Sequence, residues 1–214
     1  MIKGMIFDLD GTTIYTLDDI ADSFNVALKE FGFPERSKED VRMGVGQGFR
    51  MLVNNLVPKD VNDELREKVA NFYKQVYAQN YWKKTAAYDG MYETIKELQS
   101  KGIKLAVNSN KSDEFTKDLI ARNFPGIEFV AVYGSREGVP HKPDPQAANE
   151  IAKLMELIPE EIAYVGDSDI DMKTGKNAGM KTVGCLWGYR DSDNLLNGGA
   201  DELIERPEQL LDII

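Results

Sequence analysis

Short β-rich runs alternate with helical patterns through the second half of this 214-residue chain, and this alternation restricts the possible folds more than any other feature. Strand, helix and strand in succession predict a parallel sheet covered by helices. The strand candidates are Met1–Asp8, Ile103–Ser109, Glu128–Tyr133, Ile162–Gly166 and Lys181–Cys185, with an edge-strand candidate near Asp201–Ile204. The helix candidates are Met91–Lys101, Ser112–Asn123, Pro145–Leu157, Asp171–Ala178 and Pro207–Ile214. We therefore expect an α/β fold with a three-layer core.

The stretch from about Thr16 to Ala87 interrupts this alternation, because it contains helical patterns and no convincing strand. Two segments repeat apolar residues at three- and four-residue steps: Leu17, Ile20, Phe24, Leu28 and Phe31, and then Leu65, Val69, Phe72, Val76 and Tyr77. We expect a small all-α cap domain at 16–87, inserted after the first strand of a core made of 1–15 and 88–214. Such an insert can cover the end of that strand like a lid. The alternative is that its helices only pad the sheet.

Two aspartates and a glycine follow the first strand in the segment GMIFDLDGTT, residues 4–13. Side chains at positions i and i+2 project to one face of a strand, so Asp8 and Asp10 present their carboxylates together and need a cation. Gly11 permits a close approach of the backbone to a ligand, and Thr12 can donate to phosphate oxygens. The alternative is a strand that ends in a polar turn.

Two polar segments follow later in the chain. Ser109 ends the second strand, and its hydroxyl with the amide of Asn110 is suited to hold a phosphate oxygen, although helix capping is an alternative. Lys142 precedes a proline at a helix start, which limits its conformations, although a solvated lysine is the default. His141 is the only histidine and is interpreted as a surface turn residue, so a general acid or base must be sought among the carboxylates.

An acidic run ends the fourth strand, in Gly166-Asp167-Ser168-Asp169-Ile170-Asp171. Three aspartates in five residues exceed what a helix cap needs, although capping is the alternative. If this strand lies beside the first, Asp167 would face Asp8 and Asp10. Mg²⁺ is the natural ion for such a set of carboxylate oxygens.

Composition narrows the classes of partner. The formal net charge of −10 argues against a nucleic-acid backbone or an anionic membrane surface. No apolar stretch is long enough for a signal h-region or a membrane span. Cys185 is the only cysteine, so no internal disulfide can form, and it is interpreted as a small buried hydrophobe. We expect a cytoplasmic monomer or homodimer that acts on a small molecule.

Four motifs in this order resemble the haloacid dehalogenase superfamily of phosphotransferases: Asp8-Leu9-Asp10-Gly11-Thr12, then Ser109, then Lys142, then the segment 166–171. The resemblance runs over nearly the whole chain. It implies a Rossmann-like core with a helical, C1-type cap and a Mg²⁺ cofactor. It also implies that Asp8 is the nucleophile and that Asp10 protonates the leaving oxygen and later activates water.

The same resemblance implies roles for the remaining motifs. Ser109 and Lys142 would hold the phosphoryl group and the nucleophile, while Gly11 and Thr12 line the phosphate. Asp167 would complete a magnesium site with Asp8 and a backbone oxygen of Asp10, supported by Asp171. A carboxylate with an unperturbed pKa near ~4 is ionised at neutral pH, so Asp8 is expected to attack without a base. Its repulsion from phosphate would be offset by magnesium and Lys142.

Two stretches resemble the phosphoglycolate phosphatase-like branch of this superfamily. They are a glycine-rich loop, residues 42–48 (RMGVGQG), and the C-terminal segment 186–190 (LWGYR) with 199–201 (GAD). Arg42 and Gly44 are therefore candidates for substrate binding. A second anion could be bound by Arg42, Arg50, Lys111 or Arg190. Tyr15 departs from the small polar or acidic residue usual in the family, which leaves the hinge of the cap in doubt but no catalytic role.

These features favour a Mg²⁺-dependent phosphatase that hydrolyses a small, phosphoglycolate-like phosphate monoester through an aspartyl-phosphate. A β-phosphoglucomutase-like sugar phosphomutase is the first alternative. A pyrophosphatase or a nucleotide monophosphatase of the same superfamily is a further one. A non-catalytic binding protein that kept the fold is a third, although it leaves the intact catalytic positions without a purpose.

Overall fold

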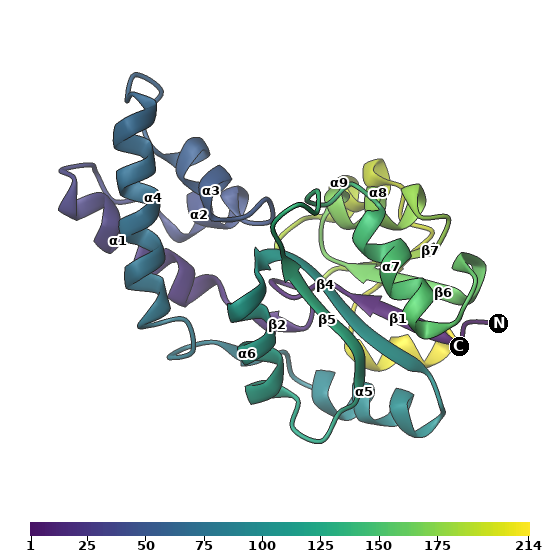
Figure 1. The fold of residues 1–214 in the computed structure, drawn as a ribbon. Coiled ribbons are helices and arrows are strands. Elements are labelled where there is room, and N and C mark those ends of the chain that lie inside the picture. The colour runs from purple at the N-terminus through teal and green to yellow at the C-terminus, as the bar shows by residue number, and fades with distance from the viewer.

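The computed structural model describes residues 1–214, and a six-stranded parallel sheet forms its centre (Figure 1). The strand order is β5 (Phe129–Ser135), β4 (Lys104–Ser112), β1 (Gly4–Phe7), β6 (Ile162–Gly166), β7 (Lys181–Cys185) and β8 (Glu202–Ile204). In the register of the sheet, Phe7 of β1 lies opposite Val107 of β4 and Val165 of β6. The residues at the carboxyl ends of these three central strands therefore meet at one edge of the sheet, the edge where its parallel strands end.

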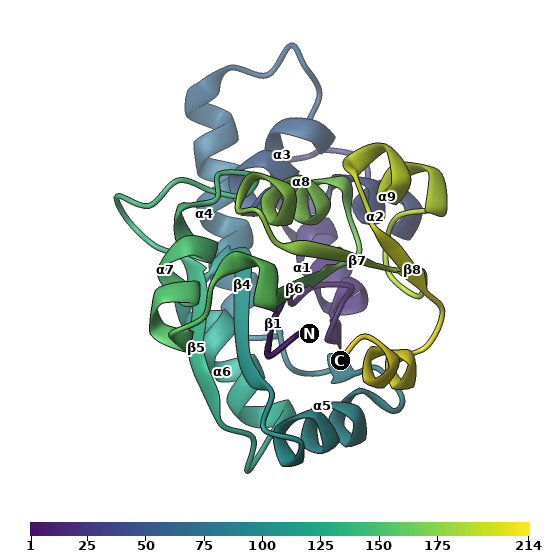
Figure 2. The ribbon, with the colours of Figure 1, turned by 90° about the vertical axis from the view of Figure 1, so that its right-hand side faces the viewer.

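Helices cover both faces of the sheet (Figure 2). On one side Met5 and Phe7 join an apolar cluster that contains residues of α5 (Met91–Ser100), α6 (Asp113–Asn123) and the 3₁₀ helix η2 (Pro207–Asp212). On the other side Ile6 packs in a separate cluster with residues of α7 (Gln146–Met155), and α8 (Asp169–Asn177) covers β6 and β7. Because neighbouring side chains of a strand point to opposite faces, one buried strand serves both clusters. The predicted three-layer α/β core is confirmed.

Four helices form an insert beside the edge where β1 ends (Figure 1). They are α1 (Leu17–Glu30), α2 (Lys38–Gly44), α3 (Phe49–Leu56) and α4 (Asp63–Ala78). Phe24 of α1 and Tyr73 of α4 pack edge to face with ring centroids 5.5 Å apart. The predicted helical insertion is therefore confirmed. The longest helix, α4, has 16 residues, and none in the chain combines the length and apolarity needed to cross a membrane.

Several boundaries differ from the sequence prediction. The chain enters and leaves the insert through an antiparallel ribbon of β2 (Ile14–Tyr15) and β3 (Ala86–Ala87), whose two-residue strands are too short to show a pattern. The C-terminal segment forms the 3₁₀ helix η2 rather than an α-helix, and a 3₁₀ turn η1 (Pro159–Glu161) precedes β6. The short helix α9 (Ser192–Gly198) was not predicted, because seven residues carry little periodicity.

Candidate active site

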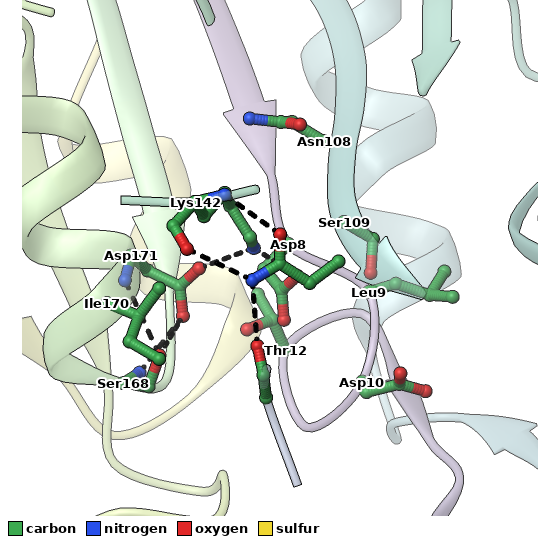
Figure 3. Close-up of polar contacts among 12 residues, drawn as sticks. Asp8, Leu9, Asp10, Thr12, Asn108, Ser109, Lys142, Ser168, Ile170 and Asp171 are labelled. Carbon is green, nitrogen blue, oxygen red and sulfur yellow. Dashed lines mark hydrogen bonds and ion pairs between the residues drawn. The ribbon is translucent and has the colours of Figure 1, made fainter. Parts of the chain in front are cut away.

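Lys142 lies between Asp8 and Asp171 at the edge where the central strands end (Figure 3). Its Nζ donates to Asp8 Oδ1 at 2.6 Å and to Asp171 Oδ1 at 2.7 Å. All three side chains are buried, with 4%, 9% and 2% of their surfaces exposed. The backbone N–H of Lys142 donates to Asn110 Oδ1 at 2.9 Å, so β4 holds the lysine's own segment in place. The geometry joins Lys142 to Asp8 as an ion pair.

A cluster of three carboxylates surrounds this lysine. Oxygen atoms of Asp8, Asp167 and Asp171 lie within 4.8 Å of one another, and all three residues are buried. Lys142 is the one cation that forms an ion pair with this cluster, so two negative charges are in excess when all three carboxylates are ionised. Buried anions in excess are costly without a cation. A Mg²⁺ ion fits this donor set, because it prefers carboxylate oxygens and keeps several waters.

Close backbone packing holds Asp167 in position. A Cβ atom at Gly11, where φ is 91°, would lie 2.3 Å from Asp167 Oδ2, and one at Gly188 would lie 2.2 Å from Asp167 Cβ. Only glycine fits at either position. The N–H of Tyr189 donates to Asp167 Oδ2 at 2.7 Å, and the Thr12 hydroxyl donates to Oδ1 at 3.2 Å. Gly11 and Thr12 therefore contact this aspartate from the loop after β1.

Burial changes the ionisation of the cluster. Burial raises the pKa of Asp8 well above its ordinary value, the ion pair with Lys142 opposes this rise, and Asp171 and Asp167 add to it. Burial, with Asp171 nearby, raises the pKa of Asp167 to about 7. Burial alone would lower the pKa of Lys142, but Asp171 and Asp8 raise it well above its ordinary value. The prediction that Asp8 has an unperturbed pKa is wrong, because burial raises that pKa more than Lys142 lowers it.

Asp10 makes a different set of contacts from Asp8, and Figure 3 shows its carboxylate apart from the bonds around Lys142. Asp10 Oδ1 accepts from the Thr16 hydroxyl at 2.7 Å and from Lys111 Nζ at 2.9 Å, and Oδ2 accepts from Lys111 at 3.1 Å. The N–H of Thr16, at the start of α1, donates to the Tyr189 hydroxyl at 3.0 Å. Neither Thr16 nor Tyr189 was predicted as a site residue, because only their tertiary contacts distinguish them. The insert begins in direct contact with Asp10.

Asp8 and Asp10 open into a cavity that reaches solvent between the sheet edge and the insert. Ser109 and Asn110 line it from the core, with Lys111, Ser112 and Phe115. The insert supplies the remaining wall, from Ile20, Val45, Gly46, Gly48, Phe49, Leu52, Tyr73, Lys74 and Tyr77. A smaller cavity of about 250 Å³ adjoins Asp8 on the side of Lys142, Asp167 and Asp171. Two spaces therefore meet at Asp8, one charged and one largely apolar.

Arg42 and Gly44 lie outside the lining of both cavities. The Arg42 guanidinium donates to Glu39 and to the backbone carbonyl of Tyr189. Gly44 packs inside the insert, where an added Cβ would lie 2.8 Å from Leu52 Cδ1. Arg42 therefore joins the insert to the core, and Gly44 allows close packing within the insert.

The other cations considered for a second anion also differ in position. Arg190 donates to the backbone carbonyls of three insert residues, Arg42, Met43 and Val45, at 2.8 to 3.0 Å. Arg50 pairs with Glu67 on the surface of the insert, with 66% of its side chain exposed. Lys111 lines the larger cavity, and Arg190 also lines the smaller one with Asp167. The exposed His141 bonds Ser135 at 2.7 Å, in agreement with its interpretation as a surface residue.

Known proteins are similar to this chain over most or all of its length. The family model described as haloacid dehalogenase-like hydrolase matches residues 5–185. The chain is 34% identical over 214 residues to a phosphoglycolate phosphatase of Aquifex aeolicus, with 100% of this chain and 97% of the relative covered. It is 31% identical over 219 residues to a phosphoglycolate phosphatase of Vibrio vulnificus, with 100% and 96% covered. A crystal structure from Lactobacillus delbrueckii subsp. bulgaricus, provisionally named a phosphoglycolate phosphatase, superposes with a TM-score of 0.92 at 29% identity and covers 99% of this chain and 98% of that one.

Proposed function

This chain belongs to the haloacid dehalogenase-like hydrolase family, and from that premise we propose that it is a Mg²⁺-dependent phosphatase for a small, phosphoglycolate-like phosphate monoester. The names of its full-length relatives support the substrate. One observation carries the reaction: Lys142 holds Asp8 at 2.6 Å where a charged cluster meets an open cavity. A carboxylate so placed can attack phosphorus, and the cavity can receive the leaving group.

In the first half of the reaction, an oxygen of Asp8 forms a bond to phosphorus. The bond from phosphorus to the ester oxygen breaks, and its electron pair remains on that oxygen. Asp10, which faces the same cavity, donates a proton to the leaving oxygen, and the alcohol departs. Asp8 is then an aspartyl-phosphate.

In the second half, Asp10 takes a proton from a water molecule as the water oxygen bonds to phosphorus. The bond between phosphorus and Asp8 breaks, which releases inorganic phosphate and restores the carboxylate. Asp10 is then protonated and ready for the next ester. Thr16 holds Asp10 beside the start of the insert throughout, at 2.7 Å in this structure.

The remaining polar residues would bind the phosphoryl group and the ion. Asp8, Asp167 and the backbone carbonyl of Asp10 would hold Mg²⁺, with Asp171 acting through Lys142. When bound, the ion neutralises charge on the phosphoryl oxygens. Lys142 and the Ser109 hydroxyl, with amides near Gly11, Thr12 and Asn110, would contact those oxygens.

The insert would act as the cap of this site. In that proposal, residues 16–87 form the cap domain and 1–15 with 88–214 form the core. The β2–β3 ribbon joins the two, and the loop that contains Gly46 touches the core where Asn110 Nδ2 donates to the Gly46 carbonyl at 3.0 Å. A cap so placed excludes water from the cavity and selects the leaving group.

A phosphate-release screen with and without Mg²⁺ tests the proposal. The panel contains phosphoglycolate, pyrophosphate, nucleoside monophosphates and sugar phosphates. We expect phosphoglycolate to be hydrolysed fastest and EDTA to abolish the activity. Conversion of a sugar 1-phosphate into its 6-phosphate without free phosphate would instead identify a mutase. If no ester releases phosphate, the non-catalytic binding protein is the alternative that remains.

A further inference from the structure

A buried hydroxyl without a partner lies on the tyrosine beneath a buried lysine, and both residues line the larger cavity. The Lys111 side chain is only 7% exposed. Its Nζ pairs with Asp10 and lies 4.8 Å from the centre of the Tyr77 ring. The Tyr77 hydroxyl is buried without any hydrogen-bond partner, and the residue is 4% exposed. Buried polar groups are normally paired, so an unpartnered hydroxyl on a residue that lines the cavity points to a ligand atom that can reach it.

We propose that Lys111 and Tyr77 bind a carboxylate on the leaving group, so that the substrates are phosphate monoesters of small hydroxy acids. This inference rests on the proposed phosphatase function and adds the residues that recognise the substrate. Phosphoglycolate is the smallest member of the class. The two donors lie side by side but come from different parts of the molecule, Lys111 from β4 of the core and Tyr77 from α4 of the insert.

The present contacts of Asp10 explain why an anion is needed here. Both Asp10 oxygens are occupied, by Lys111 at 2.9 and 3.1 Å and by Thr16 at 2.7 Å. Asp10 cannot face a leaving oxygen while it neutralises this lysine. A buried ammonium that loses its carboxylate needs another anion. A substrate carboxylate can take that place, which frees Asp10 for proton transfer and gives the Tyr77 hydroxyl an acceptor.

The charge of the cavity favours a carboxylate over a second phosphate. Lys111 is the one buried cation in its wall, since Lys74 is 43% exposed and pairs with Glu114 at 3.2 Å. One ammonium balances a carboxylate, whereas a phosphate dianion would keep an uncompensated charge in a buried site. Much of the rest of the wall is apolar, from Ile20, Val45, Phe49, Leu52 and Phe115. Such a wall offers few partners to the hydroxyls of a sugar.

Two matched substrates isolate the carboxylate. Phosphoglycolate and 2-hydroxyethyl phosphate have the same two-carbon chain, and they differ only in a carboxylate against a hydroxymethyl group. We expect wild-type protein with Mg²⁺ to prefer phosphoglycolate in kcat/KM by about 10- to 100-fold, the range for a charge-assisted hydrogen bond. Lys111→Met should reduce this ratio to near one. Lys68→Met, which removes an exposed lysine paired with Glu64 on α4, should leave the ratio unchanged.

Tyr77→Phe provides a second variant that keeps the ring beneath Lys111. It removes only a hydroxyl that has no partner in the protein, so it should fold as stably as the wild type. We expect it to lower the preference for phosphoglycolate by about 3- to 10-fold. Its thermal unfolding and circular dichroism establish that the fold is retained.

The outcomes separate this inference from the proposed function. If wild-type protein hydrolyses both esters equally well, the carboxylate site is refuted and the phosphatase stands. If Lys111→Met slows both esters alike, Lys111 serves Asp10 and not the substrate. A faster reaction with 1,2-ethanediol bisphosphate than with phosphoglycolate would assign the site to a second phosphate instead. If no ester releases phosphate, the phosphatase itself fails, and calorimetry of phosphoglycolate with Asp8→Asn and with Asp8→Asn/Lys111→Met tests the site directly: equal affinities would refute it.

Discussion

The two sides of Asp8 differ in how completely their polar groups are satisfied. On the core side, Lys142 bonds two carboxylates, and Asp167 is held by Tyr189 and Thr12. On the insert side, the cavity wall is largely apolar and contains a tyrosine hydroxyl without a partner. Groups that perform the same reaction on every substrate can be fixed in advance, whereas groups that recognise a leaving group must stay free for it.

The difference also follows from the scaffolds. The core groups follow three adjacent parallel strands whose register is set by the sheet. The insert contributes side chains from helices. These reach the core through the β2–β3 ribbon, whose strands have two residues each, and through the loop that contains Gly46. Under the proposed function, the reacting groups lie on the sheet, and the groups that select the substrate lie in part on the insert.

Asp8→Asn should have the largest effect and would establish the core side as the reaction centre. The amide cannot form the aspartyl-phosphate, so phosphate release should fall by about 10⁴-fold or more. The fold should persist, because the change removes a charge from a cluster with excess negative charge. Asp60→Asn, on the exposed surface of the insert, is the control for a lost carboxylate. Activity within tenfold of wild type would exclude Asp8 as the nucleophile.

Lys142→Met should reduce both stability and activity. It leaves Asp8 and Asp171 without their buried partner, so we expect a loss of about 3 kcal/mol in the free energy of unfolding and of about 100-fold or more in kcat/KM. Urea unfolding and phosphate release measure the two effects. Lys3→Met breaks an exposed pair with Glu161 and should cost less than about 1 kcal/mol. Equal losses in both variants would contradict the distinction between the buried cluster and the surface.

The pH dependence of Mg²⁺ binding tests the charge on the core side. Without metal and below about pH 7, the folded protein holds a proton on Asp167, because the pKa of about 7 exceeds the unfolded value. The pKa of Asp8 is raised in the same direction. This contribution to stability is present at low pH and is lost as the pH rises through about 7. Magnesium needs the ionised carboxylates, so its affinity should fall about tenfold for each unit below that point.

Thermal unfolding with and without Mg²⁺ near pH 6 and near pH 8 measures this linkage. We expect the larger increase in Tm near pH 8, because the ion must then displace fewer protons from the carboxylates. Asp167→Asn should reduce both the increase and its dependence on pH. The same increase at both pH values would show that the ion binds elsewhere.

Arg190→Met should have the smallest effect and tests how the insert is held. The substitution removes three hydrogen bonds to carbonyls of the insert, at Arg42, Met43 and Val45. We expect KM for the phosphate ester to rise by about 3- to 10-fold with kcat little changed, and amide hydrogen exchange in residues 42–48 to become faster. Arg50→Met removes an insert cation whose ion pair, with Glu67, lies within the insert, and it should change neither. A fall in kcat alone would place Arg190 in the chemistry instead.

Motifs at strand ends were the predictable part of the site. Asp8, Ser109 and Asp167 each follow or end an apolar run, and parallel strands bring such ends together. The pairing of Asp10 with Lys111 was not predictable, because the two residues lie 101 positions apart in the sequence. Position in a motif did not indicate the contacts of Arg42, whose guanidinium bonds Glu39 and the Tyr189 carbonyl and lines neither cavity.

Residue periodicity and spacing were enough to establish the parallel sheet, the helical insert and the order of the acidic motifs, because each depends on neighbours along the chain. Packing between distant segments decided the rest. It placed Lys142 between Asp8 and Asp171, raised the pKa of Asp8 through burial, and left Lys111 as the buried cation of a largely apolar cavity. Desolvation and charge pairing depend on which groups meet in three dimensions, and local sequence carries little record of those meetings.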